Sequence, residues 1–221
     1  MSKRVPDQPH LTLYTESTYR GLPLLNCDSG FVGQYLERLH STIHHSVDSY
    51  SKVFAVRVDL HFPQYYVPEW QDNFSNEYLH SFIKALEGGL QNYKTEKQRM
   101  GQRIHNLRFK YVWAREYGPS SYRPHFHLLL LFNGHAFKSL GQFSCDRDSL
   151  FNRIGEAWGN ALGIHVVEGS KFTHFPEQGQ FFIGSRNPDL VAKVFHRASY
   201  LAKVASKNFH DGYHVFGGSR H

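Results

Sequence analysis

The alternation of apolar and polar residues along the chain predicts strands in three places. Lys52–Phe62 alternates and is rich in β-branched residues, so its side chains should divide between the two faces of a sheet. Leu107–Glu116 is a second candidate, and the continuously apolar Leu128–Phe132 has the character of a central strand covered on both faces. In the first strand, one face would carry Phe54, Val56 and Val58, and the other Ala55, Arg57, Asp59 and His61.

Helical spacing of apolar residues and helix-start signals account for most of the remaining chain. They predict helices over residues 31–47, 75–100, 148–162 and 189–207. Residues 163–182 are expected to be irregular or short-stranded, and residues 212–221 to form an edge strand and a basic tail. The polar, turn-rich residues 1–28 are expected to form an irregular N-terminal arm, which leaves residues 29–221 as a single domain.

Two histidines and a glutamate stand beside the most apolar of these strands. His125 and His127 precede Leu128–Phe132 and lie two residues apart, so both imidazoles would project from one face. A turn at 118–121 would fold Glu116 back beside them in a hairpin, giving two nitrogens and one oxygen that can bind a metal. Taken alone, a His-x-His pair is more often packed or exposed than metal-bound, and the hairpin register decides whether Glu116 faces it.

The composition favours a globular protein with a polyanionic partner. Of 221 residues, 40% are hydrophobic and 15% aromatic, and a net charge of +6 with a pI near 9.3 makes nucleic acid the leading candidate. No apolar stretch has the length of a signal peptide or a membrane span, so we expect a cytoplasmic protein with no membrane partner. Two isolated cysteines, Cys27 and Cys145, agree with a reducing compartment.

A tyrosine and a lysine far along the chain indicate what such a metal site would do. Tyr200 and Lys203 lie three residues apart in the predicted helix 189–207, and hence on one face. A metal with three protein ligands keeps positions open for a phosphate oxygen, and a tyrosine attacks when a cation stabilises its deprotonated hydroxyl. This combination predicts transesterification of a DNA phosphodiester by Tyr200. In isolation, such residues are more often a core-edge aromatic and a solvated charge.

Other polar residues have supporting parts in this hypothesis. Asp59 and His61 share a strand face near its end and are given a secondary role, toward the metal or toward solvent. DNA contacts are predicted for four arginines: Arg57, Arg115, Arg123 and Arg197. A phosphate-contacting rim is conceivable at the end of helix 75–100, where the basic residues are Lys94, Lys97, Arg99 and Arg103. A basic last turn more often only complements the helix dipole.

The ordered motifs resemble those of the HUH endonucleases. Pro124-His-Phe-His127 looks like the His-hydrophobic-His motif of these enzymes, Tyr200-Leu-Ala-Lys203 resembles the Tyr-x-x-Lys motif of their single-tyrosine replication initiators, and Glu116 matches a metal-binding glutamate of several viral members. The strand ending at Pro63 falls where their first motif is expected, with a different sequence. Over about residues 50–218, the chain also resembles inovirus and prophage replication-initiator-like proteins, the YagK/YfjJ C-terminal-domain family, in the blocks RVDLHFP, EYG, PHFHLLLLFNGH, AWG and RASYLAK.

The resemblance implies an α+β fold in which a central antiparallel sheet is flanked by helices. It implies a rolling-circle replication initiator that nicks and rejoins single-stranded DNA at a phage or prophage origin in the bacterial cytoplasm. Tyr200 and Lys203 would be catalytic, and Glu116, His125 and His127 would bind Mg²⁺ or Mn²⁺. Since no Gly-x-x-x-x-Gly-Lys-Ser/Thr sequence occurs, a host helicase and DNA polymerase would be partners.

Three alternatives stay open at this point. A transposase or mobilisation relaxase would use the same chemistry on a different DNA substrate. A non-catalytic DNA-binding regulator could retain the same scaffold. A zinc hydrolase would use Tyr200 only to orient water.

Overall fold

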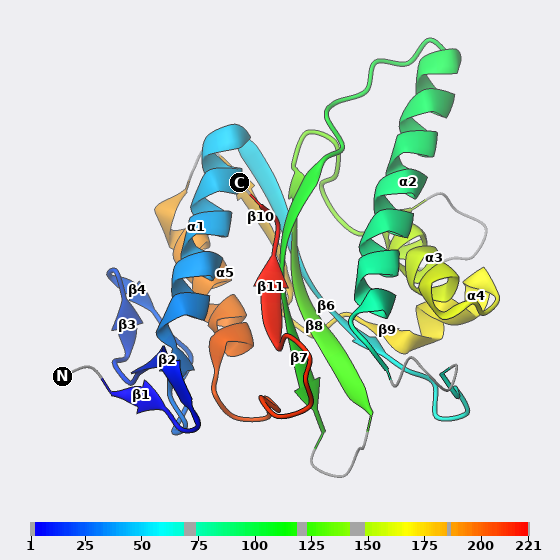
Figure 1. The fold of residues 1–221 in the computed structure, drawn as a ribbon. Coiled ribbons are helices and arrows are strands. Elements are labelled where there is room, and N and C mark those ends of the chain that lie inside the picture. The colour runs from blue at the N-terminus through cyan, green and yellow to red at the C-terminus, as the bar shows by residue number, and fades with distance from the viewer. Residues whose placement is uncertain (1–2, 69–73, 119–122, 142–148, 185–186, 221) are drawn as a thin grey trace.

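A large antiparallel sheet with helices on both faces organises the chain, which confirms the predicted α+β fold (Figure 1). The structure is a computed structural model that describes residues 3–68, 74–118, 123–141, 149–184 and 187–220. Cys145, Asp148 and most of the predicted turn at 118–121 therefore lie outside the described residues.

The described part of the sheet has β8 at its centre, paired with β6 on one side and β7 on the other. The strand order is β10-β6-β8-β7-β11, and β9 pairs with β6 beside β10. The predicted hairpin, the predicted C-terminal edge strand and the three predicted strand positions are confirmed to within a few residues. The strands are β6 Lys52–His61, β7 Phe109–Tyr117, β8 Pro124–Asn133, β9 Thr173–His174, β10 Gln180–Gly184 and β11 Phe216–Gly218.

Both faces of β8 are covered, as its apolar run predicts. Leu128 and Leu130 belong to the core beneath α2 and α3, whereas Leu129 and Leu131 belong to the core beneath α1 and α5. All four side chains have 0% of their surface exposed. Because successive side chains of a strand point to opposite faces, this one strand contributes to two separate cores. Burial of each leucine side chain stabilises the fold by about 1.5–3 kcal/mol.

The helices form one layer on each side of the sheet. Figure 1 shows α1 and α5 on one face and α2, α3 and α4 on the other. Caps delimit α3 at both ends: Ser149 Oγ accepts a hydrogen bond from the Asn152 N–H, and Gly163 ends the helix with a φ of 66°. The helices are α1 Gly33–Ser49, α2 Glu77–Arg99, α3 Leu150–Leu162, α4 Val166–Gly169, η1 Ser170–Phe172, α5 Pro188–Ala198 and η2 Ser199–Ala202. Within the described ranges, none of them combines the length and apolarity needed to cross a membrane.

The single helix predicted over residues 189–207 is wrong in its second half. The α-helix α5 ends at Ala198, the short 3-10 helix η2 follows, and Lys203 is extended with a ψ of 148°. A β-bridge joins Phe31 to Lys203, and the Val204 N–H donates to the Gly30 carbonyl at 3.0 Å. The N-terminal part of the chain therefore ends this helix, through a contact that local periodicity does not contain.

The irregular arm predicted for residues 1–28 is also wrong for its described residues. They form the short strands β1 Arg4–Val5, β2 Gln8–Tyr14, β3 Thr18–Tyr19 and β4 Leu22–Pro23, and β2 pairs with β5 Phe31–Val32. The side chain of Gln34, on α1, holds β2 by accepting from the Thr12 N–H at 2.9 Å and donating to the His10 carbonyl at 2.9 Å. Tertiary hydrogen bonds thus order a segment whose own sequence is polar and turn-rich.

Candidate active site

The two histidines of β8 continue the sheet face that α1 and α5 cover. Leu129 and Leu131 fill the apolar part of this face, and the same alternation places His127 and His125 at its edge. His127 is buried, with 6% of its surface exposed, and His125 is half-buried. The strand therefore presents two imidazoles on one face beside a dry core, as the sequence predicts.

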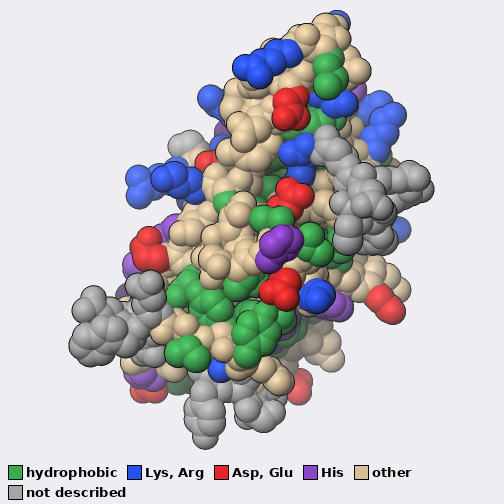
Figure 2. Space-filling view, turned by 90° about the vertical axis from the view of Figure 1, so that its right-hand side faces the viewer, with side chains coloured by type: hydrophobic (Ala, Val, Ile, Leu, Met, Phe, Trp, Pro, Cys, Tyr) green, Lys and Arg blue, Asp and Glu red, His purple; other side chains and the backbone are tan. Residues whose placement is uncertain are grey.

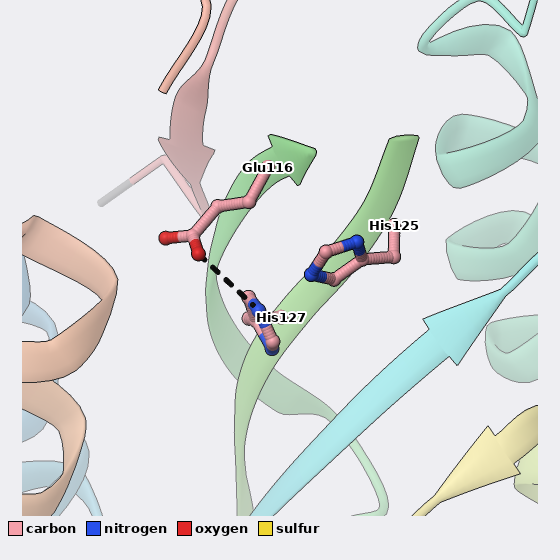
Figure 3. Close-up of side chains that lie close together, drawn as sticks. All are labelled: Glu116, His125 and His127. Atoms are coloured by element: carbon pink, nitrogen blue, oxygen red, sulfur yellow. Dashed lines mark ion pairs between the residues drawn. The ribbon is translucent and has the colours of Figure 1, made fainter. Parts of the chain in front are cut away.

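The register of the hairpin brings Glu116 to the histidines. Glu116 on β7 lies directly opposite His125 on β8, so the expected pairing is confirmed. One ligand atom of each of Glu116, His125 and His127 lies within 4.8 Å of the other two, and Glu116 Oε2 is 3.4 Å from His127 Nε2. Figure 3 shows the three side chains pointing toward one another from the two strands.

Asp59 orients His127 from the neighbouring strand β6. Asp59 lies opposite His127 in the sheet, and its Oδ1 accepts a hydrogen bond from His127 Nδ1 at 2.6 Å. Arg57 Nη2 donates to the same oxygen at 2.9 Å. The imidazole is thereby fixed with Nε2 toward Glu116, which is how a carboxylate usually supports a metal-binding histidine. Of the two roles left open for Asp59, the geometry favours the one directed at the metal site, through His127.

The charges of this pair follow from its contacts. Burial opposes ionisation of Asp59, but the hydrogen bond and charge of His127, together with Arg57, outweigh burial and lower the pKa of Asp59 to about 2. Burial likewise opposes protonation of His127, but its hydrogen bond to Asp59 and the nearby charges of Asp59 and Glu116 outweigh that effect and raise its pKa. His127 is therefore held between two carboxylates.

His61 packs against the other histidine of the pair. The rings of His61 and His125 stack with centroids 5.2 Å apart. Burial, followed by the charges of His127 and His61, lowers the pKa of His125 to about 4, and burial also lowers the pKa of His61. His125 is thus neutral near pH 7 and has a lone pair for a metal. The ring contact with His125 therefore places His61 beside the candidate metal ligands.

The donor set fits a divalent cation. His127 Nε2 is buried and has no hydrogen-bond partner among the described residues, although it faces the Glu116 carboxylate. A buried polar atom without a partner is costly unless another group completes its coordination. Two imidazole nitrogens and a carboxylate oxygen, all near one point, offer such a group three ligands. The predicted metal itself stays a prediction.

Lys207 is a further member of the site that the sequence motifs do not reveal. Its Nζ lies 2.7 Å from Glu116 Oε1, while Lys203 Nζ lies 3.2 Å from Oε2 and Ser206 Oγ donates to Oε2 at 2.7 Å. Burial opposes the charge of Glu116, yet His127 and Lys207 outweigh it and hold its pKa well below the usual range. Complete burial lowers the pKa of Lys207. No spacing or motif in the sequence marks Lys207 as a member of this site, because the helix ends before Lys203.

Tyr200 and Lys203 reach this cluster from the other end of the chain. The Tyr200 ring meets the His127 ring edge to face, with centroids 5.2 Å apart. Lys203 Nζ lies 3.6 Å from the centre of the Tyr200 ring, so its ammonium stands between the ring and Glu116. The Tyr200 hydroxyl has no hydrogen-bond partner in the described part of the chain. The structure therefore brings the predicted nucleophile and its cation beside the predicted metal ligands.

Two of the four arginines predicted to contact DNA are internal. Arg57 has 3% and Arg115 1% of its surface exposed. Strand alternation turns Arg115 away from Glu116, and its guanidinium donates to the Phe74 carbonyl at 2.6 Å and to Asp211 at 3.3 Å. Both guanidinium groups are therefore held by internal contacts, and Arg57 Cζ also lies 5.4 Å from the centre of the Tyr200 ring; DNA contact by Arg57 and Arg115 stays a prediction.

The other two arginines, Arg123 and Arg197, are less buried. Arg123 donates to the Pro63 carbonyl and lies over the Phe74 ring, with its Cζ 5.5 Å from the ring centre. Arg197 donates to the Glu177 carbonyl at 3.3 Å. For these two side chains, DNA contact stays a prediction.

Comparison with known proteins gives one family and two relatives. The model of the YagK/YfjJ C-terminal domain family matches residues 14–219. The Escherichia coli K12 protein named "Uncharacterized protein YfjJ" is 29% identical over 199 residues, which cover 86% of this chain and 95% of the relative. "Uncharacterized protein YagK", from the same organism, is 31% identical over 196 residues, which cover 85% of this chain and 92% of the relative. No solved structure matches significantly.

Proposed function

This chain belongs to the YagK/YfjJ C-terminal domain family, and from the side chains gathered on its sheet we propose that it is a metal-dependent enzyme that nicks and rejoins single-stranded DNA. The observation that carries the proposal is the placement of Tyr200 and Lys203 against the cluster of Glu116, His125 and His127. A nucleophile, a cation and a metal-binding set in contact make up the parts that phosphodiester transfer needs.

The proposed reaction starts at the Tyr200 hydroxyl. The Tyr200 oxygen attacks the phosphorus, a bond forms between them, and the bond from phosphorus to the 3′ oxygen breaks. The tyrosine proton goes to solvent, and the released 3′ oxygen takes up a proton as a hydroxyl. Attack by a 3′ hydroxyl on the tyrosyl phosphodiester reverses these steps. The energy of the broken bond is kept in the covalent intermediate, so rejoining needs no ATP.

The surrounding side chains have separate roles in this scheme. Lys203, whose ammonium touches the Tyr200 ring, stabilises the negative charge that develops on the phenolic oxygen. Asp59 keeps His127 in the orientation that exposes Nε2 to Glu116. A bound Mg²⁺ or Mn²⁺ would supply a Lewis acid for the phosphate oxygens.

The biological role proposed here extends the same chemistry. The His125 to His127 motif and the Tyr200 to Lys203 motif are similar to those of HUH replication initiators, which favours rolling-circle initiation at a phage or prophage origin. The chain has no Walker A sequence, so strand separation and synthesis would fall to a host helicase and DNA polymerase in the bacterial cytoplasm.

The test is the formation of a covalent adduct. The protein is incubated with Mn²⁺ and 3′-labelled single-stranded fragments that tile the replicon encoding it, and the products are separated after denaturation. The native protein should retain label, and Tyr200→Phe should not. Tyr213→Phe is the matched control, because Tyr213 lies under Arg115, with the arginine Cζ 4.6 Å from its ring centre, and should leave the adduct intact. An adduct that persists in Tyr200→Phe, or no adduct with native protein, contradicts the proposal.

A further inference from the structure

Most of the net positive charge of the chain comes from one short segment. Residues 94–110 carry six cations and one carboxylate, a balance of +5 out of the +6 of the whole chain. The remaining residues are therefore close to neutral. Figure 2 shows Lys and Arg side chains gathered over the upper part of the molecule, where α2 ends. From the sequence alone, most of these charges would only complement the helix dipole.

The structure arranges part of this segment around a cavity. The cavity has a volume of about 690 Å³ and lies between the end of α1, the second half of α2 and the start of β7. Lys94, Arg108 and Lys110 line it, and Glu87 is the carboxylate among the described lining residues. We call this cavity the basic pocket. The three cations come from α2, from β7 and from the residue that precedes β7, an arrangement that a helix-dipole role does not require.

The cations of the basic pocket are not neutralised by the protein. Lys94 and Arg108 have no ion pair with any described residue. Lys110 Nζ donates to the Arg220 carbonyl at 3.3 Å, a contact that leaves its charge uncompensated. With three cations and the one carboxylate of Glu87, the described lining keeps an excess of positive charge, and a bound polyanion would reduce the repulsion between the cations. The pocket is therefore suited to phosphate groups.

We propose that the basic pocket binds the phosphate backbone of duplex DNA next to the strand that reacts. The proposal rests on the proposed function for the identity of the polyanion. The pocket lies where β7 begins and Glu116 where it ends, seven residues later. At ~3.3 Å per residue this separation is about 23 Å, or ~7 base pairs at ~3.4 Å each. One DNA molecule can therefore occupy both places.

The lining favours a duplex over a single strand. Proteins that bind single strands combine basic grooves with exposed aromatic rings on which bases stack. The described aromatic residues of the basic pocket are not placed as exposed stacking rings. Phe109 is 8% exposed, and the Tyr50 hydroxyl donates to the Arg108 carbonyl at 3.2 Å. Without stacking platforms, the three cations of the basic pocket are suited to phosphate contacts, which both strands of a duplex offer.

The test measures duplex binding and its dependence on salt. The probe is a fluorescent duplex of about 20 base pairs of arbitrary sequence, and binding is followed by anisotropy. Three variants are compared: the native chain, Lys94→Gln/Arg108→Gln/Lys110→Gln, and the control Lys84→Gln/Lys138→Gln/Lys171→Gln, whose exposed lysines lie outside the basic pocket. Losing three phosphate contacts should lower the salt slope by about 2.7 and the affinity on the order of 100-fold at ~0.15 M salt.

The control variant removes the same charge and should bind within about threefold of the native chain, since exposed lysines far from the DNA act only through screened fields. Equal losses in both variants, or no loss in the pocket variant, would overturn the proposal. Loss of single-stranded binding with duplex binding intact would overturn the choice of duplex. The pocket variant should still form the tyrosyl adduct on a short single-stranded fragment, so failure of the nicking proposal is seen separately.

Discussion

Replacing Lys207 with methionine should destabilise the folded protein, because its ammonium is the buried counter-charge of Glu116. The Lys207 side chain has 0% and the Glu116 side chain 1% of its surface exposed, and Nζ lies 2.7 Å from Oε1. Methionine fills a similar volume, so the substitution removes the charge with little change in packing. The Glu116 carboxylate then stays buried and loses its shortest ionic contact.

The size of the effect can be bounded from the remaining contacts. Removing one partner of a buried ion pair costs about 3–5 kcal/mol when the other charge is left alone. Glu116 keeps Lys203 at 3.2 Å and Ser206 at 2.7 Å, so it is not left alone, and we expect a smaller loss of ~2–3 kcal/mol, at or below the lower end of that range. Lys203→Met is the matched control. Because 14% of the Lys203 side chain is exposed, water can replace its ammonium, and the cost should be about 1 kcal/mol.

The assay is equilibrium unfolding in urea at neutral pH in a double-mutant cycle. Glu116→Gln alone leaves the Lys207 ammonium buried without its anion, and Glu116→Gln/Lys207→Met removes both charges. The double variant should be more stable than the sum of the single losses predicts, with a coupling of about 1–3 kcal/mol. Losses that add to within ~0.5 kcal/mol would show that the two charges do not stabilise each other, and would refute the reasoning.

Three further predictions concern single side chains. His127→Ala should abolish the covalent adduct in denaturing gels and leave single-stranded DNA retention largely intact; equal loss of both would indicate a structural role. Asp59→Asn should weaken Mn²⁺ binding, followed by titration calorimetry, by about 10–100-fold, because the carboxylate no longer orients His127; unchanged affinity would contradict this. Burial raises the pKa of Tyr35 to about 12 in the folded protein. Between pH ~10 and pH ~12 the Tyr35 hydroxyl therefore ionises in the unfolded chain but not in the folded one, and the stability of the fold decreases as the pH rises. Urea unfolding at pH ~9.5 and ~11.5 measures this loss of stability. In Tyr35→Phe the loss between the two pH values should be smaller by ~1–2 kcal/mol, a figure that allows for partial solvent screening. A loss identical to that of the native chain would contradict the prediction.

The parts of the fold that the sequence predicts are those whose information is local. The strands β6 and β8 follow from alternation and from an apolar run, and the site ligands Glu116, His125 and His127 follow from spacing and one hairpin. These features depend on residues close together in the chain, so period and turn signals suffice to place them.

The features that the sequence misses all depend on contacts between distant residues. The end of α5 is set by the bridge from Phe31 to Lys203, the strands of residues 3–28 by hydrogen bonds to α1, and the buried position of Lys207 by Glu116. No local pattern distinguishes a lysine that will be buried by a partner 91 positions away from one that stays in solvent. The same applies to Arg115, a strand arginine whose partners Phe74 and Asp211 lie in two distant segments of the chain.

The central claim is that Tyr200 becomes covalently attached to DNA, and the most direct test is to identify the modified residue. After reaction with Mn²⁺ and single-stranded DNA, the protein is digested with nuclease and protease, and the peptides are measured by mass spectrometry. We predict that the peptide containing Tyr200 carries a nucleotide joined through the tyrosine oxygen. A nucleotide on any other residue, or none on a protein that cleaves the DNA, would contradict the account.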